Sequence, residues 1–142
     1  MTTTKLLIAS AIIAISQTSF ASEHQQGEEL FKIYCDACHG MTGGMDMSKR
    51  IAPPIAAVRM HYIRYYRDEA SFVNAVSGWV EKQDPNRSLM RGAIRRFNLM
   101  PPVAIKSEDA RKIARYIHAG NIQKPAGMEE HVQQQHKKAG MN

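Results

Sequence analysis

The chain has 142 residues, a formal net charge of +6 and 44% hydrophobic residues, which fits one small domain with a single core. Its two cysteines argue against a four-ligand zinc site, because no further cysteine or histidine stands at matching spacing. The chain is basic but contains no nucleic-acid recognition motif, so we expect no binding to nucleic acid.

The N-terminal residues 1–21 have the pattern of an export signal. Lys5 provides a positive start, residues 6–15 form an apolar run, and Ser19 and Ala21 are small residues at the positions that a signal peptidase reads. The run is shorter than the roughly 20 apolar residues that a membrane span needs. We therefore expect cleavage after Ala21, export to the periplasm and no stable membrane insertion. The alternative is an uncleaved membrane anchor.

The exported part divides into a domain, residues 22–120, and a polar, glutamine-rich tail, residues 121–142. Residues 133–138 have no apolar face to bury, and we expect the tail to be mobile. In the domain, a loop rich in Gly, Met and Pro follows the first of several predicted helices. The helices are expected over residues 22–35, 56–66, 69–80, 89–97 and 107–120. No segment alternates as a strand would, so the predicted fold class is all-α.

Capping residues support two of these helices. Asp68 stands at the N-cap position of the third helix. Ser107 is the expected N-cap of the last helix, and Gly120 is placed to end it. Glu108 and Asp109 suit the positive end of that helix dipole.

The motif Cys35-Asp36-Ala37-Cys38-His39 carries the strongest chemical signal. Two thiols three positions apart, followed by an imidazole, form the attachment pattern of c-type haem. Each thiol can add to one vinyl group, and His39 is then carried to the iron. The other interpretations are a redox Cys-x-x-Cys pair, a structural disulfide or half a zinc site. Haem is the prediction, and covalent attachment outside the cytoplasm agrees with an export signal.

Met100 is the candidate for the second axial ligand. It precedes Pro101-Pro102, whose fixed φ angles stiffen the backbone next to the thioether. Met90, Met60 and His61 are the alternatives. An ordinary core methionine is the other interpretation of Met100.

Taken together, these segments resemble a class I cytochrome c. The resemblance covers residues 26–119 and is carried by the motif Cys35 to Gly40, by Phe97-Asn98-Leu99-Met100-Pro101-Pro102, and by Tyr116-Ile117 in the last helix. It implies a small cytochrome c fold around one haem c. In that family Cys35 and Cys38 would form thioethers, His39 would be the proximal ligand and Met100 the distal ligand.

The resemblance implies two further contacts. The first and last helices of the family cross at a small residue, which places Gly27 and Phe31 against Tyr116. A proline carbonyl after the haem motif accepts the Nδ1 proton of the proximal histidine, and either Pro53 or Pro54 could supply it.

Two departures from the family pattern remain, which are the long tail and a loop with three methionines. Met41, Met45 and Met47 close to His39 raise the alternative of a soft Cu(I) site.

The expected function is electron transfer by a soluble carrier, because ligands at both axial positions leave no open site for substrate. One alternative is a haem enzyme or gas sensor with an open sixth iron position. Another is a haem subunit of a larger respiratory or dehydrogenase complex. The expected partners are redox proteins, whose acidic docking surfaces would match a cluster of four arginines without nearby acids: Arg87, Arg91, Arg95 and Arg96. A solvated helix face is the other interpretation of this cluster.

Overall fold

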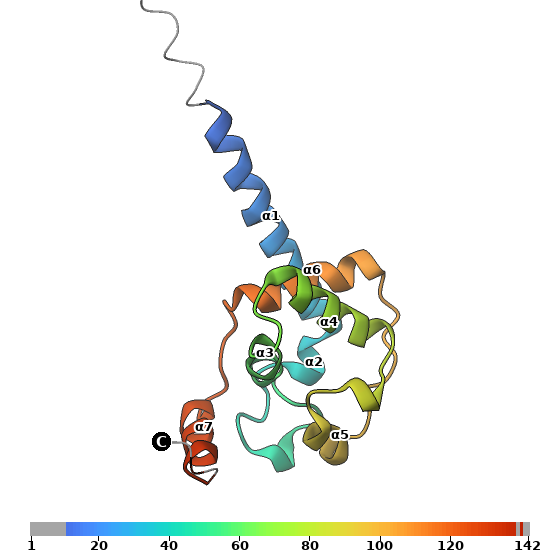
Figure 1. Ribbon diagram of the computed structural model, residues 1–142, viewed down its shortest axis with the longest axis vertical. Helices are drawn as coiled ribbons and strands as arrows, with labels where there is room; N and C mark the ends of the chain where they lie inside the picture. Colours follow the sequence, from blue (N-terminus) through green and yellow to red (C-terminus); the bar gives the residue numbers. More distant parts are fainter. Residues whose placement is uncertain (1–10, 139, 141–142) are drawn as a thin grey trace, which may run out of the picture.

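A computed structural model describes residues 11–138 and 140, and all of their regular secondary structure is helical (Figure 1). Lys5 and the first half of the apolar run of the export signal lie outside these residues. The elements are α1 Ala11–Tyr34, α2 Asp36–His39, η1 Met47–Lys49, α3 Ile55–Ile63, α4 Glu69–Glu81, η2 Pro85–Arg87, α5 Arg91–Phe97, α6 Ser107–Ala119 and α7 Met128–Lys138. No strand occurs within the described ranges, and the all-α prediction is confirmed.

The crossing of α1 over α6 positions the start of the domain. A Cβ atom on Gly27 would lie 2.8 Å from the Cβ of Tyr116, closer than real Cβ contacts allow. Glycine therefore lets the two backbones approach, and the rings of Phe31 and Tyr116 then pack with centroids 5.7 Å apart. The predicted contact between these helices is confirmed.

The core forms where α4 also packs on α6. Phe72 and Val73 of α4 and Ile113 and Ile117 of α6 are all buried. These residues recur at helical spacing, so each helix turns one apolar side inward. The N-cap of α4 is as predicted, since Asp68 accepts a hydrogen bond of 2.9 Å from the backbone N–H of Ser71.

The ends of α6 agree with the sequence only in part. Gly120 has φ 84°, the left-handed conformation expected of a residue that ends a helix. The prediction that Ser107 is the N-cap is wrong, because Lys106 occupies that position and Ser107 is the first helical residue. Lys106 makes no side-chain capping bond, so the start of α6 is stabilised mainly by Glu108 and Asp109 in its first turn.

Other helix boundaries shift by a few residues. The helix α1 starts at Ala11, upstream of the predicted domain, and extends beyond the other helices at its N-terminal end (Figure 1). The helix α3 ends at Ile63, three residues before the predicted end at position 66. The helix α5 begins at Arg91, two residues later than predicted.

The C-terminal segment differs most from expectation. It forms the helix α7, and Met128 in its first turn is only 5% exposed. The predicted lack of an apolar face in residues 133–138 agrees with the exposure of residues 133–135 and 137, whereas Met128, upstream of that stretch, is buried. A hollow of about 520 Å³ lies between this segment and α3, lined by Met60 and Ile63 on one side and Met128 and Val132 on the other. The mobility of the segment stays a prediction.

Candidate cofactor site

The four residues predicted from the sequence to bind the cofactor, Cys35, Cys38, His39 and Met100, line one cavity of about 300 Å³. Among the described residues, no Lys, Arg, Asp or Glu contributes to its walls. Its apolar lining includes Val76, Trp79, Val80, Ile94, Phe97 and Ile113. A cavity of this size and character is typical of a site for a large apolar ligand.

The thiol end of the site is built by a single helical turn. After α1 ends at Tyr34, the backbone N–H groups of Cys38 and His39 both donate to the carbonyl oxygen of Cys35, at 3.1 and 2.9 Å. This turn holds both cysteines and the histidine at the cavity. Both thiols are free. Burial, with smaller contributions from Cys38 and Asp36, raises the pKa of Cys35 to about 11, so this thiol is protonated at neutral pH.

The imidazole of His39 is oriented by a backbone carbonyl. Its Nδ1 lies 2.8 Å from the carbonyl oxygen of Pro53. Because a carbonyl can only accept, Nδ1 carries the proton and Nε2 keeps its lone pair for a metal. Burial lowers the pKa of His39, against the opposing effect of the Pro53 hydrogen bond, and the ring is held in the neutral form that binds metals.

This contact also decides between the two prolines that the sequence left open. Pro53 supplies the carbonyl, whereas Pro54 is buried and occupies the N-cap position of α3. The two prolines thus have different roles, one at the cofactor site and one at the start of a helix.

Arg50 is a residue of the site that sequence reasoning missed. It is 7% exposed, and its guanidinium donates to four backbone carbonyls. The acceptors are Gly40 at 2.6 Å, Thr42 at 2.7 Å, Gly44 at 3.0 Å and Ala52 at 3.1 Å. Arg50 therefore ties the residue after His39 to the residue before Pro53. An arginine beside Lys49 in a glycine-rich loop looks solvated, so no local pattern signals this role.

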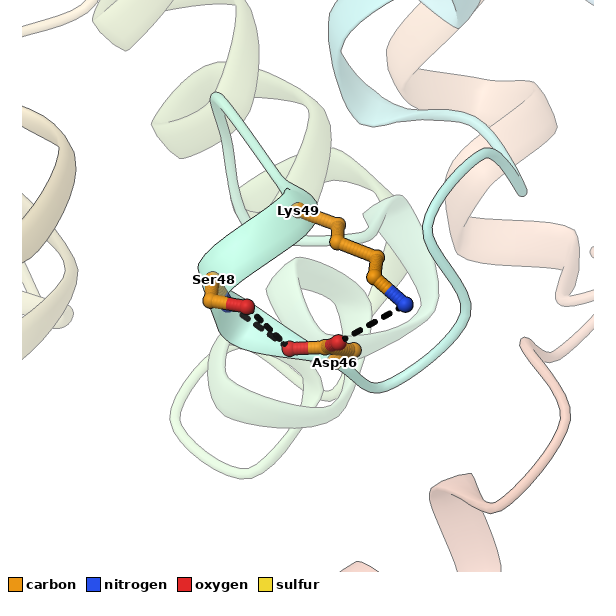
Figure 2. A network of polar contacts seen from close by, with 3 residues as sticks. All are labelled: Asp46, Ser48 and Lys49. Carbon is orange, nitrogen blue, oxygen red and sulfur yellow. Dashed lines mark hydrogen bonds and ion pairs between the residues drawn. The ribbon is translucent and has the colours of Figure 1, made fainter.

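A second polar network shapes the outer part of the same loop (Figure 2). Asp46 Oδ1 accepts hydrogen bonds from the backbone N–H of Ser48 at 3.0 Å and from its hydroxyl at 2.6 Å. Lys49 lies 3.2 Å from Asp46 Oδ2. The hydrogen bonds from Ser48, with the help of Lys49, lower the pKa of Asp46. The carboxylate thus caps the short helix η1 that leads to Arg50.

The distal candidates separate clearly. Met100 and Met90 both line the cavity, whereas Met60 lines the hollow next to α7 and His61 is exposed. Asn98, just before Leu99 and Met100, has φ 65° and ψ −177°, a conformation that only glycine adopts readily. The backbone is therefore strained where the chain turns toward Met100.

The alternative of a copper site in the methionine loop gains no support from the cavity. Met41 is exposed, Met45 and Met47 are half-buried, and none of the three lines the cavity that contains His39. Within the described part of the chain, no group of three His, Cys, Asp or Glu side chains could hold a metal ion.

Comparison with known families agrees with this site. The family model described as cytochrome c oxidase, cbb3-type, subunit III matches residues 22–117. The chain belongs to this family. It is a monohaem c-type cytochrome domain with haem-based electron transfer. No curated protein and no solved structure matches the chain.

The residues present fit the haem c that the family implies. The cavity is apolar, two free thiols lie at its wall, and the tautomer of His39 leaves Nε2 available. None of the described helices has the length and apolar character required to cross a membrane.

Proposed function

We propose that the chain is an exported electron carrier whose haem c is attached through Cys35 and Cys38 and ligated by His39 and Met100. The observation that carries this proposal is the shared cavity, in which all four side chains meet beside an imidazole with a fixed tautomer. When bound, the haem supplies a one-electron Fe(II)/Fe(III) couple.

The polypeptide contributes three things to such a carrier. The Pro53 carbonyl holds the His39 ring and increases its basicity, which strengthens an axial ligand. Met100 lines the same cavity and would supply the second ligand of the haem iron, which would leave no position open to substrate. The apolar walls keep water from the metal, and water exclusion changes its potential.

Export to the periplasm follows from the N-terminal pattern. The family match begins at residue 22, immediately after the expected cleavage position at Ala21. Covalent attachment of haem to Cys35 and Cys38 also takes place outside the cytoplasm.

A basic surface beside the site is suited to an acidic redox partner. Four arginines around α5, namely Arg87, Arg91, Arg95 and Arg96, are exposed. Ala93, Ile94 and Phe97 of the same helix line the cavity, so these charges lie close to the cofactor. Association steered by this surface should weaken steeply as the salt concentration rises.

The test is the optical spectrum of the purified holoprotein with and without carbon monoxide. The wild-type protein should be low-spin and unchanged by the gas. Met100→Ala should keep its covalent haem and bind carbon monoxide, because one axial position is then open. Met60→Ala is the matched control, since Met60 lies in the other hollow, and it should behave as wild type.

Two outcomes would point elsewhere. If Met90→Ala, and not Met100→Ala, opens the iron, the distal ligand is Met90. If the wild-type protein itself binds carbon monoxide, the protein has an open site and is a haem enzyme or gas sensor.

A second candidate function is that of a haem subunit in a larger respiratory complex. The printed family description favours it, and Ile33 and Ile51 leave 72% and 70% of their surface exposed. Purification from native membranes without detergent separates the two functions, because a carrier would be recovered as a monomer and a subunit would not.

A further inference from the structure

We propose that the exported chain binds one square-planar divalent metal ion, Cu(II) or Ni(II), at its new N-terminus. The ligands are the α-amine of Ser22, the backbone amide nitrogens of Glu23 and His24, and the imidazole Nδ1 of His24. This proposal rests on the cleavage after Ala21 that belongs to the proposed function, and the site does not exist in the uncleaved chain.

The position of His24 supplies the chemistry. After cleavage it is the third residue, and its Nδ1 can close a chelate with the amine and the two intervening amides. Four nitrogen atoms in one plane form the geometry that Cu(II) and Ni(II) prefer, and imidazole suits both ions. A histidine one position earlier or later could not complete the same set of rings.

The helix α1 does not compete for these amides once the leader is gone. In an α-helix the N–H of each residue donates to the carbonyl four residues earlier. For Glu23 and His24 these acceptors are residues 19 and 20, which leave with the signal peptide. Both amide groups then belong to the first turn of a helix, where N–H groups have no intrahelical partner.

The side chain of His24 is also placed to leave its packed position. Its ring stacks edge-on against Tyr116, with centroids 5.2 Å apart, and its Nε2 is buried without a hydrogen-bond partner among the described residues. Chelation through Nδ1 puts a proton on Nε2 and turns the ring toward solvent, where this N–H can bond to water. The loss of the contact with Tyr116 is therefore offset by a satisfied polar atom.

The basic side chains near the site are paired with carboxylates. Ser22 and Glu23 are exposed, and Lys32 of α1 forms an ion pair of 2.7 Å with Glu28, which follows His24 by four residues. Lys112 is the facing base from α6, and it forms an ion pair of 2.9 Å with Glu108. His24 does not line the cofactor cavity, so the metal site is separate from the haem.

Binding releases protons, which gives the site a distinctive pH dependence. The Ser22 ammonium and the two amide N–H groups each give up one proton to solvent, and the imidazole binds through the lone pair of Nδ1. The apparent affinity should therefore rise as the pH rises. No electron is transferred.

The test uses the processed holoprotein, exported with its own leader, and begins with its intact mass. The mass should correspond to a chain that starts at Ser22 and carries one haem. Addition of Cu(II) chloride should load one equivalent per chain that survives gel filtration against free histidine. The electron paramagnetic resonance spectrum of the loaded protein should be that of copper bound to four nitrogen atoms. Ni(II) should compete with Cu(II) for the site.

Three variants make the result specific. His24→Ala should lose the retained equivalent, and so should a chain with one glycine inserted after Ser22, which moves the imidazole out of register. His131→Ala is the matched control, a half-buried histidine on α7, and it should keep the copper. The haem spectrum should be the same in all variants.

A mature chain that starts at any residue other than Ser22 would overturn the site. So would a correct N-terminus that retains no copper, or retention that survives His24→Ala. Because the haem spectrum and the response to carbon monoxide are read from the same samples, failure of the metal site is distinguishable from failure of the electron-carrier function.

Discussion

The two ends of the cofactor cavity are built in different ways. On the side of His39, the chain from Gly40 to Pro53 is held by its own hydrogen bonds, above all by the four carbonyls around Arg50. On the side of Met100, no side-chain hydrogen bond to residues 98–102 occurs within the described part of the chain. Stiff prolines and a strained Asn98 shape that segment instead.

The ring of His39 is therefore oriented by the polypeptide alone, whereas the position of Met100, the proposed second ligand, would depend more on its bond to the iron. A ligand fixed before the cofactor arrives loses little entropy on binding. In the proposed ligation the thioether of Met100 would be a weak ligand on a less anchored segment, so this side of the cavity should open first under stress. The following predictions test this comparison, from the largest expected effect to the smallest.

Replacement of Arg50 should have the largest effect. Arg50→Ala leaves four carbonyl oxygens without their donor and should lower the free energy of unfolding by roughly 2–4 kcal/mol, measured by urea denaturation. Arg50→Lys keeps the charge but cannot reach all four acceptors, and it should recover only part of the loss. If Arg50→Lys is as stable as wild type, the loop is held by the positive charge and not by the several N–H donors of the guanidinium.

The helix crossing that carries the haem motif gives the second test. Gly27→Ala places a Cβ 2.8 Å from the Cβ of Tyr116 and should destabilise the fold by about 1–3 kcal/mol in the same assay. Gly78→Ala in α4 is the matched control, since its Cβ would meet nothing within 4 Å. That variant should be neutral or more stable by about 0.5–1 kcal/mol. Equal losses in both variants would argue against the close approach of α1 and α6.

The strained backbone at Asn98 tests the Met100 side of the cavity. Asn98→Gly should relieve the backbone at φ 65° and raise stability by up to about 1 kcal/mol, whereas Asn98→Val should lower it. The Asn98→Gly protein should also bind carbon monoxide no more readily than wild type. A loss of stability in Asn98→Gly would show that the asparagine side chain, and not the backbone, matters there.

Acid should have the smallest effect, and it acts on the proximal loop through Asp46. The hydrogen bonds from Ser48 lower the pKa of Asp46 in the folded protein. The stabilisation is thus present above the unfolded pKa of about 3.9 and is lost as the pH falls through the lower folded pKa. As the pH is lowered through this range, the urea midpoint should fall less steeply for Asp46→Asn than for wild type. Ser48→Ala should lie between them, and three identical slopes would contradict the assignment.

Much of the fold could be predicted because its signals are local. Apolar residues at helical spacing mark α4 and α6. Asp68 marks the start of α4 through its hydrogen bond to Ser71, and Gly120 marks the end of α6 through its left-handed backbone conformation. The start of α6 was missed by one residue because Ser107 offers a capping side chain that the helix does not use. The helix α7 was missed because its burial depends on a hollow beside α3, which no pattern in residues 121–142 reveals.

By itself the sequence determined which groups stand together at the thiol end, since Cys35, Cys38 and His39 fall within one helical turn and need no distant contact to come together. Only the tertiary structure decided which proline supports His39, which methionines reach the cavity, and that Arg50 is buried. These choices depend on how loops close over long separations. The hydrogen bonds that close them run from the side chains of His39 and Arg50 to backbone carbonyls. Every residue carries such a carbonyl, so the acceptors leave no mark in the pattern of side chains.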